Sequence, residues 1–357
     1  MSCYNPMIAV NTGRVNPETG KKEYKFLKSL RNWTTDEEMR KYGEPEWFEY
    51  SDSMLGHGVP LIDLETGEVV NRAVVLPCGQ CLGCRTAYAA QWADRIMLES
   101  FEHEKSYFVT LTYADLFVPR NISSDGETVL TLRPKDMQDF LKRLRRQQSY
   151  HHENEIRFYG VGEYGSLKHR PHYHIIIFGL HLDDLYEIGR NKAGRMLHSS
   201  KVIEKLWPYG RVEVDDLSWE SAAYTARYTV KKLGKAETDF YKEHNLVPEF
   251  SRMSLKPGIG QKYFDENAKT IYEYDKIHIP TSNGVRTVKP PRFYDRKYDD
   301  IDPTCMDEIK GNRQEIARQH VRTKMQNYSG SYFELLEAEE RAFKTRTKSL
   351  RRELEDG

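Results

Sequence analysis

The sequence has no long apolar segment, no secretory leader and no net charge. No apolar run reaches the length of about 18 residues that a transmembrane helix needs. The opening stretch, MSCYNPMIAVNTGRVNPETG, lacks the basic and apolar regions of a signal peptide. With 30% charged residues and a mean hydropathy of −0.75, the chain is soluble. We therefore expect an intracellular protein with no membrane partner, built from its 357 residues as two domains or one domain with appendages.

Cysteine is scarce, and in an intracellular protein the five cysteines should be reduced. Cys78, Cys81 and Cys84 follow a C-x2-C-x2-C spacing, and Cys3 is a possible fourth ligand. Thiolates prefer Zn²⁺, and a closed four-sulfur site is structural. We favour a structural zinc that ties the N-terminal segment to the next helix, with free buried cysteines and an iron–sulfur cluster as alternatives. Cys305 has no partner and is interpreted as an ordinary residue.

Equal numbers of basic and acidic residues, 54 each, exclude a global electrostatic attraction to nucleic acid. Local charge is uneven, because residues 133–148 carry six basic and two acidic residues. Residues 341–352 carry six basic residues and no acidic one. The simplest interpretation of either run is a solvated helix face. The 23 tyrosines are a mild indication of base stacking or phosphate contacts.

The apolar periodicity and turn residues predict an α+β fold, an antiparallel sheet backed by helices. The predicted helices cover residues 86–104, 133–148 with Pro134 in the first turn, 218–235, and a charged C-terminal stretch from about 330. The predicted strands cover residues 105–115, 156–165, 172–180 and 210–218. Ser218 and Ser221 offer caps for the third helix, and Gly234 should end it. Between that helix and residue 330 we expect loops.

Three segments follow from this pattern. Residues 1–85 form an irregular N-terminal segment with short strands and the expected cysteine–metal staple. Residues 86–240 form the core, and residues 241–357 form a loop-rich and helical C-terminal extension.

Two histidines share one face of a predicted strand in the stretch RPHYHIIIFGL, residues 170–180. Side chains at i and i+2 of a strand point the same way, so His172 and His174 face one side and Tyr173 the other. The apolar run that follows is typical of a central strand. Two imidazoles at this spacing suit one metal ion, and Glu163 on the preceding strand is a candidate third ligand. Such a site with open positions favours Mg²⁺ or Mn²⁺. Histidines and a glutamate without a metal role are the alternative.

The helix over residues 218–235 carries a second constellation. Tyr224 and Tyr228 are i and i+4 and stack on one face, and Lys231 lies within about 60° of them. The opposite face, which we expect to be buried, is apolar: Ala222, Ala223, Ala226, Val230 and Leu233. The pattern therefore predicts two phenols and an ammonium group presented away from the buried side. A purely structural tyrosine pair beside an exposed lysine is the alternative.

Phenols beside an open metal site fit one reaction. A tyrosine oxygen attacks a phosphodiester and leaves a covalent phosphotyrosine and a free hydroxyl. Because the pKa of tyrosine is about 10, the attack needs help from the metal and from Lys231. Two tyrosines allow two successive transesterifications, and the energy of the cleaved bond is kept in the ester.

YFVTLTY, RPHYHIIIFG and YTARYTVKK, in this order, resemble the three motifs of the HUH endonucleases of rolling-circle replication. Tyrosines placed after the histidines match the order of replication initiators, whereas relaxases have the reverse order. Together with PCGQCLGCR, GEYG and MSLKPGIG, the set most resembles the replication initiators of small single-stranded DNA phages of the gokushovirus type. The resemblance spans roughly residues 75–295.

The resemblance implies that His172 and His174 bind the metal on an HUH/RRM-like core and that Tyr224 and Tyr228 are nucleophiles. Glu163 is a less secure ligand, because the third ligand varies in the superfamily. It also implies that Thr110 and Thr112 lie near the DNA. The expected partners are single-stranded DNA, supercoiled viral origin DNA, and a host DNA polymerase and helicase, in the cytoplasm of a bacterial host.

The basic helix at residues 133–148 gains weight as a DNA-binding face from this resemblance. The expected DNA contacts are Arg133, Lys135, Lys142, Arg143, Arg145, Arg146 and Lys232. The loop SLKPGIG is either a phosphate contact or a turn. Two rival functions stay open: a single-tyrosine transposase in which Tyr228 alone is essential, and a binding module with inert histidines whose aromatic residues stack on bases.

Overall fold

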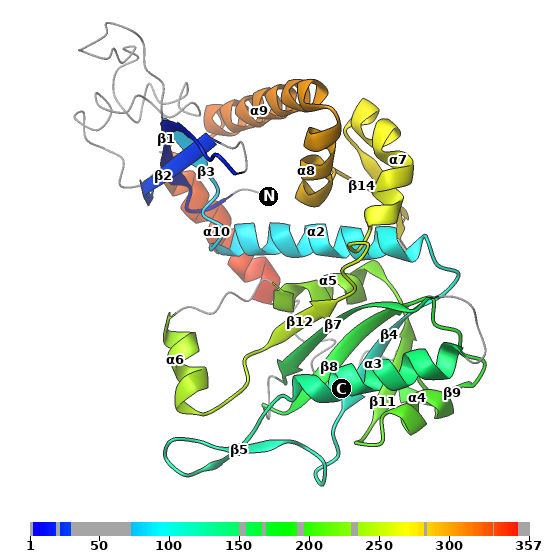
Figure 1. Ribbon diagram of the computed structural model, residues 1–357. Helices are drawn as coiled ribbons and strands as arrows, with labels where there is room; N and C mark the ends of the chain where they lie inside the picture. The colour runs from blue at the N-terminus through cyan, green and yellow to red at the C-terminus, as the bar shows by residue number, and fades with distance from the viewer. Residues whose placement is uncertain are drawn as a thin grey trace, which may run out of the picture. The chain divides into compact units, whose positions relative to one another are not determined.

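The computed structural model of the chain describes residues 3–18, 22–29, 73–149, 155–165, 169–190, 196–229, 235–281, 284–330 and 332–348 (Figure 1). The chain divides into two compact units. The first comprises Met1–Ala87 and Thr304–Ser349, and the second comprises Tyr88–Pro303 and Leu350–Gly357. The division falls inside helix α2 (Leu82–Ser100). The three segments expected from the sequence stay a prediction.

A seven-stranded antiparallel sheet forms the centre of the second unit, in the order β12-β7-β8-β4-β11-β10-β9. Four strands match the predicted ones: β4 (Ser106–Thr112), β7 (Arg157–Tyr164), β8 (Pro171–Phe178) and β11 (Val212–Asp216). The histidine-bearing β8 lies between β7 and β4, so it is an interior strand as its apolar run predicts. The predicted α+β class with an antiparallel sheet is confirmed.

Three strands of this sheet were not predicted: β9 (Leu185–Arg190), β10 (Met196–Ser200) and β12 (Phe250–Met253). The two outermost, β9 and β12, carry no fully buried residue, so they lack the apolar signal of an interior strand. They are held by backbone pairing to β10 and β7. A two-stranded hairpin of β5 (Arg120–Ile122) and β6 (Thr128–Leu130) follows β4.

Helices cover both faces of the sheet in the second unit (Figure 1). Helix α3 (Pro134–Ser149) begins at the predicted proline, and with α4 (Lys201–Leu206) it covers one face. Residues Tyr173, Ile175 and Ile177 of β8 belong to the buried core under these helices. Helix α5 (Trp219–Thr229) covers the other face, and Ala226 packs there with Ala89 of α2.

The start of α5 is capped as predicted. The backbone N–H of Ser221 donates to Ser218 Oγ over 3.1 Å, and the N–H of Ser218 donates to Ser221 Oγ over 3.0 Å. This reciprocal pair satisfies amide groups that the first turn of a helix leaves without partners. The predicted end of the helix at Gly234 lies outside the described residues.

The expectation of loops between α5 and residue 330 is wrong. This part contains α6 (Lys235–Glu243), α7 (Gln261–Tyr274), the hairpin β13 (Ile277–Thr281)–β14 (Gly284–Val288), α8 (Arg292–Ile301) and α9 (Pro303–Gln326). Distant contacts support several of these elements. The Arg95 guanidinium donates to Ile259 O over 2.8 Å and lies between the rings of Trp92 and Phe293. Such contacts leave no local sequence pattern.

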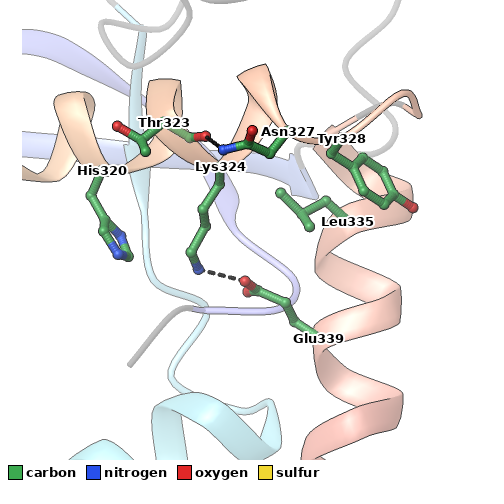
Figure 2. Close-up of a pocket in the computed structure, with 7 residues that line it drawn as sticks. All are labelled: His320, Thr323, Lys324, Asn327, Tyr328, Leu335 and Glu339. Carbon is green, nitrogen blue, oxygen red and sulfur yellow. Dashed lines mark hydrogen bonds and ion pairs between the residues drawn. The ribbon is translucent and has the colours of Figure 1, made fainter.

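In the first unit, β1 (Met7–Val15) pairs with β2 (Lys22–Ser29) and with β3 (Ala73–Leu76) in a three-stranded sheet. Helix α10 (Tyr332–Lys348) matches the predicted C-terminal helix. Figure 2 shows a cavity of about 330 Å³ beside α9 and α10, where Lys324 forms an ion pair with Glu339. Among the described helices of both units, none has the length and apolar character that crossing a membrane requires.

Candidate metal and tyrosine site

Strand register brings the predicted glutamate to the predicted histidines. In the β7–β8 pair, Glu163 lies opposite His172, and Val161 lies opposite His174. Both imidazoles point to the face that α5 covers, whereas Tyr173 between them packs into the core of the other face. The shared face of the two histidines, expected from the two-residue period of a strand, is therefore present.

One oxygen of Glu163 collects all the polar contacts of the cluster. Oε1 lies 2.7 Å from His172 Nε2, 2.8 Å from His174 Nε2 and 2.9 Å from the Tyr224 hydroxyl. The other oxygen, Oε2, is buried and has no hydrogen-bond partner among the described residues. The three ligand atoms lie within 4.8 Å of one another. A buried carboxylate oxygen without a partner costs free energy, and a cation would satisfy it.

The outer nitrogens of the imidazoles decide which way their lone pairs point. His172 Nδ1 lies 3.0 Å from Arg170 O, and because a carbonyl only accepts, the neutral ring carries its hydrogen on Nδ1. The lone pair of Nε2 then faces Glu163 Oε1 at 2.7 Å, where two acceptors repel unless a proton or a cation lies beside them. His174 Nδ1 is held 3.0 Å from Thr110 Oγ1. The donor set therefore fits a divalent cation, with both rings oriented from behind.

Burial and mutual contact set the charges of the cluster. Burial opposes ionisation of Glu163, but the two imidazoles outweigh it and hold the pKa of its carboxyl below the ordinary range. Burial lowers the pKa of His174. It also acts against the charged form of His172, where the hydrogen bond to Glu163 prevails and raises the pKa. An ionised carboxylate beside a neutral His174 is a combination that binds a cation.

Tyr224 reaches the cluster from helix α5. Its ring stands edge-on to His174, with centroids 5.2 Å apart and planes at 86°, and its side chain is buried, with 4% exposed. We expected the tyrosine to point away from the buried alanines, and this is wrong: Tyr224 is buried together with Ala222 and Ala226. The reason is the polar patch on the sheet, since the phenol can be buried where its hydroxyl finds Glu163.

The other predicted residues of this constellation are not brought to the cluster by the described contacts. Tyr228 lies one turn after Tyr224 on α5, and its side chain is outside the described part of the chain. Lys231 and Lys232 lie outside the described residues. Their roles stay predictions.

The basic helix α3 lies on the face opposite the histidines. Most of its predicted DNA contacts are exposed: Arg133, Lys135, Lys142, Arg145 and Arg146. Arg143 differs, because its Nε donates to Leu206 O over 2.9 Å and its guanidinium lies over the ring of Tyr209. These cations therefore cannot hold the same stretch of DNA as the imidazoles unless the DNA passes around the sheet edge.

Sequence reasoning missed two groups that hold the imidazoles. The carbonyl of Arg170 was not considered, and Thr110 was assigned only to the neighbourhood of DNA. The period of two along β4 puts Thr110 on the same face as the register partner His174, so pairing of the two strands would have identified it.

In the first unit, Cys3, Cys78, Cys81 and Cys84 form a four-sulfur cluster whose Sγ atoms lie within 4.8 Å of one another. Cys3 Sγ lies 3.6 Å from Cys78 Sγ and 3.9 Å from Cys81 Sγ. A tetrahedral Zn²⁺ with bonds of about 2.3 Å has sulfur–sulfur edges of about 3.8 Å, and a disulfide needs about 2.05 Å. The cluster therefore fits the predicted zinc and no disulfide.

Backbone N–H groups point at these sulfurs. Cys78 N donates to Cys3 Sγ over 3.3 Å, and Cys81 N donates to Cys78 Sγ over 3.2 Å. The hydrogen bond from the Cys3 thiol lowers the pKa of Cys81 to about 4, so one thiolate is present at neutral pH. Burial raises the pKa of Cys84 to about 11. Cys305 lies on α9 and is not part of the cluster.

Comparisons with known proteins agree on one family. A family model described as a replication-associated protein of the ORF2 type matches residues 106–233, which include the histidines, Glu163 and Tyr224. The chain is 36% identical over 298 residues to "Replication-associated protein ORF2" of Spiroplasma virus 4, an alignment that covers 83% of this chain and 90% of the relative.

Two further relatives match over a shorter part. "Replication-associated protein VP4" of Bdellovibrio phage phiMH2K is 30% identical over 229 residues, with 62% of this chain and 67% of the relative covered. "Replication-associated protein ORF4" of Chlamydia phage 1 is 32% identical over 225 residues, with 62% and 53% covered. No solved structure matches the chain.

Proposed function

Because the chain belongs to the replication-associated proteins that initiate rolling-circle replication in small single-stranded DNA phages, we propose that it is their DNA-nicking enzyme. In this proposal it cuts single-stranded DNA at the phage origin through a 5′-phosphotyrosine intermediate and later rejoins the ends. The observation that carries the proposal is the hydrogen bond from Tyr224 to Glu163, because it joins a nucleophile to the candidate metal ligands.

The chain's own groups account for the first step. Glu163 Oε1 accepts the hydrogen bond of the Tyr224 phenol and so directs its oxygen toward the imidazoles. The tyrosine oxygen forms a bond to phosphorus as the bond from phosphorus to the 3′ oxygen breaks. The phenol proton leaves along the hydrogen bond to Glu163, and the 3′ oxygen takes up a proton to become a free hydroxyl. Mg²⁺ or Mn²⁺ held by His172, His174 and Glu163 would polarise the scissile phosphate.

Tyr228 supplies the second nucleophile of the proposal, one helical turn from Tyr224. Each tyrosine in turn holds one DNA end while the other attacks, with Lys231 to stabilise the developing negative charge. The free 3′-hydroxyl then serves as primer for a host DNA polymerase with a host helicase, in the cytoplasm of a bacterial host. The four-cysteine cluster takes a structural Zn²⁺ that holds Cys3 to the start of α2.

A covalent adduct tests the proposal. Labelled single-stranded oligonucleotides that span the cognate origin are incubated with the protein and Mn²⁺ and run on a denaturing gel. An adduct that survives Tyr224→Phe and Tyr228→Phe singly and disappears in the double variant supports two working nucleophiles. Loss with one single variant supports the single-tyrosine rival, for which the contact with Glu163 favours Tyr224 over Tyr228. Tight binding without any adduct supports the binding module instead.

A further inference from the structure

Four strands line up polar residues beside the metal cluster. Glu163 on β7 and Thr112 on β4 are the register partners of His172 on either side of β8. Arg211 is the next position in this line, since Val212 lies opposite Leu111 and Thr112 N donates to Arg211 O over 2.9 Å. Neighbouring strands lie about 4.8 Å apart, so the backbone of Arg211 is about 10 Å from that of His172.

Arg211 points to the histidine face of the sheet. Val212 and Val214 are buried in the core under α3 and α4, so the alternate residues Arg211 and Glu213 face the other side. Glu213 is the register partner of Thr110, whose hydroxyl contacts His174. The guanidinium of Arg211 is held by Glu213 over 2.9 Å along the same strand.

This part of the face is open. Helix α5 packs mainly over β7, β8 and β12 rather than over β4 and β11. Thr112 and Glu213 are only partly buried, and 54% of the Arg211 side chain is exposed. The Thr112 hydroxyl has no hydrogen-bond partner among the described residues. A cation and a hydroxyl group therefore lie accessible in line with the cluster.

Charge gives the line a direction. Asp215 faces the same side as Arg211 but lies four residues further along β11, about 13 Å away. A phosphate backbone that ran along β11 would meet this carboxylate, whereas one that crosses the strands at Thr112 meets only Arg211. A path across the strands therefore avoids the repulsion.

We propose that Arg211 binds a backbone phosphate next to the scissile one, so that single-stranded DNA crosses the sheet from the cluster over Thr112 to Arg211. Glu213 acts as a positioning residue that holds the guanidinium in place. The inference rests on the proposed function, because it takes single-stranded DNA as the substrate of the same site. A guanidinium suits this task, since its planar donors match phosphate oxygens.

The test is a methylphosphonate scan, which removes the charge of one phosphate at a time in the origin oligonucleotide. Binding is measured by fluorescence anisotropy with both tyrosines changed to phenylalanine, so that no DNA is cut. Arg211→Ala should weaken binding about tenfold, as expected for one charge-assisted hydrogen bond, and lower the salt slope by about 0.7. Arg211→Lys should keep most of the affinity.

Arg252→Ala is the matched control. Arg252 is an exposed arginine of the same sheet on the opposite face, two residues from Phe250, which packs against Tyr173 in the core. The proposal holds if one methylphosphonate near the cleavage position weakens binding of the Arg252→Ala protein but not of the Arg211→Ala protein. It is overturned if both proteins lose the same affinity at every position.

Adduct formation by the tyrosine-intact protein separates this outcome from the proposed function. An adduct together with a neutral Arg211 overturns the path alone. A position-specific effect of Arg211 without any adduct supports the path and sinks the nicking mechanism. Absence of DNA binding overturns both. Thermal unfolding of each variant confirms that the substitution leaves the protein folded.

Discussion

The Tyr224 hydroxyl lies 2.9 Å from Glu163 Oε1, the oxygen that both His172 and His174 also contact. Residues from two paired strands and from a helix whose tyrosine lies 61 positions after the glutamate thus share one buried carboxylate oxygen. This arrangement links a nucleophile to three candidate metal ligands, and it leads to the first prediction.

Glu163→Gln keeps the size of the side chain and removes its charge. We expect Mn²⁺ affinity and adduct formation to fall at least about tenfold, because a neutral amide is a weak ligand for a hard cation. Calorimetric titration with Mn²⁺ and the adduct gel measure the two effects. Glu187→Gln changes an exposed glutamate of β9 and should leave both unchanged. Unaltered metal binding in Glu163→Gln would remove this residue from the ligand set.

Thr110→Val removes the hydroxyl that holds His174 Nδ1. Groups that orient a metal-binding imidazole are typically worth about ten- to hundredfold in metal affinity, so Mn²⁺ binding should weaken in that range. Thr112→Val is the control, since it is two residues along the same face of the same strand and faces His172 without a side-chain hydrogen bond. Equal Mn²⁺ affinity of the two variants would contradict the orienting role.

A buried ion pair should make stability depend on acid. Glu99 accepts from Gly260 N over 2.6 Å and pairs with Arg157 and His103. Burial raises the pKa of Glu99, but His103, Arg157 and the Gly260 amide outweigh it, so the folded pKa lies below the ordinary value of 4.5. Its contribution is present above pH 4.5 and is lost as the pH falls through the folded pKa.

Glu99→Gln should therefore lower the free energy of unfolding by about 3 kcal/mol at pH 7, because Arg157 is left buried without its partner. The difference from the unaltered protein should shrink below pH 4, as measured by thermal unfolding across pH. Asp139→Asn breaks an exposed pair with Lys135 and should have little effect at any pH. A difference that stays constant down to pH 3 would argue against ionised Glu99 in the folded state.

Metal analysis tests the cysteine cluster. We expect about one zinc per chain, lost in Cys78→Ser and retained in Cys305→Ser, because four thiolates close a structural site. Chelation should lower the melting temperature of the unaltered protein and have little effect on Cys78→Ser. Iron with sulfide in place of zinc would favour the cluster alternative, and absence of any metal would favour free cysteines.

The basic face of α3 should act separately from the nicking site. Arg145→Ala with Arg146→Ala should leave the nicking rate of a short single-stranded oligonucleotide unchanged, because these residues lie on the other face of the sheet from the histidines. Binding to supercoiled origin DNA should lose about 0.9 in salt slope for each phosphate contact removed. A large loss of single-strand nicking would show that both faces hold the same DNA.

Local patterns determined much of this protein. The period of two put His172 and His174 on one face, the pair Ser218 and Ser221 set the start of α5, and the cysteine spacing marked the four-sulfur cluster. Each of these features needs only residues a few positions apart, with Cys3 as the exception. For the same reason the four strongly apolar strands and the two amphipathic helices α2 and α3 were predictable.

Tertiary structure decided the rest. The contact of Glu163 with both imidazoles depends on the β7–β8 register, and the burial of Tyr224 depends on the polar patch beneath α5. The position of α3 opposite the histidines depends on which face of the sheet its apolar residues cover. Helices α7 and α8 are supported by contacts such as that of Arg95 with Ile259, 164 positions away. Pairing and packing energies of this kind join distant segments, and no local spacing in the sequence encodes them.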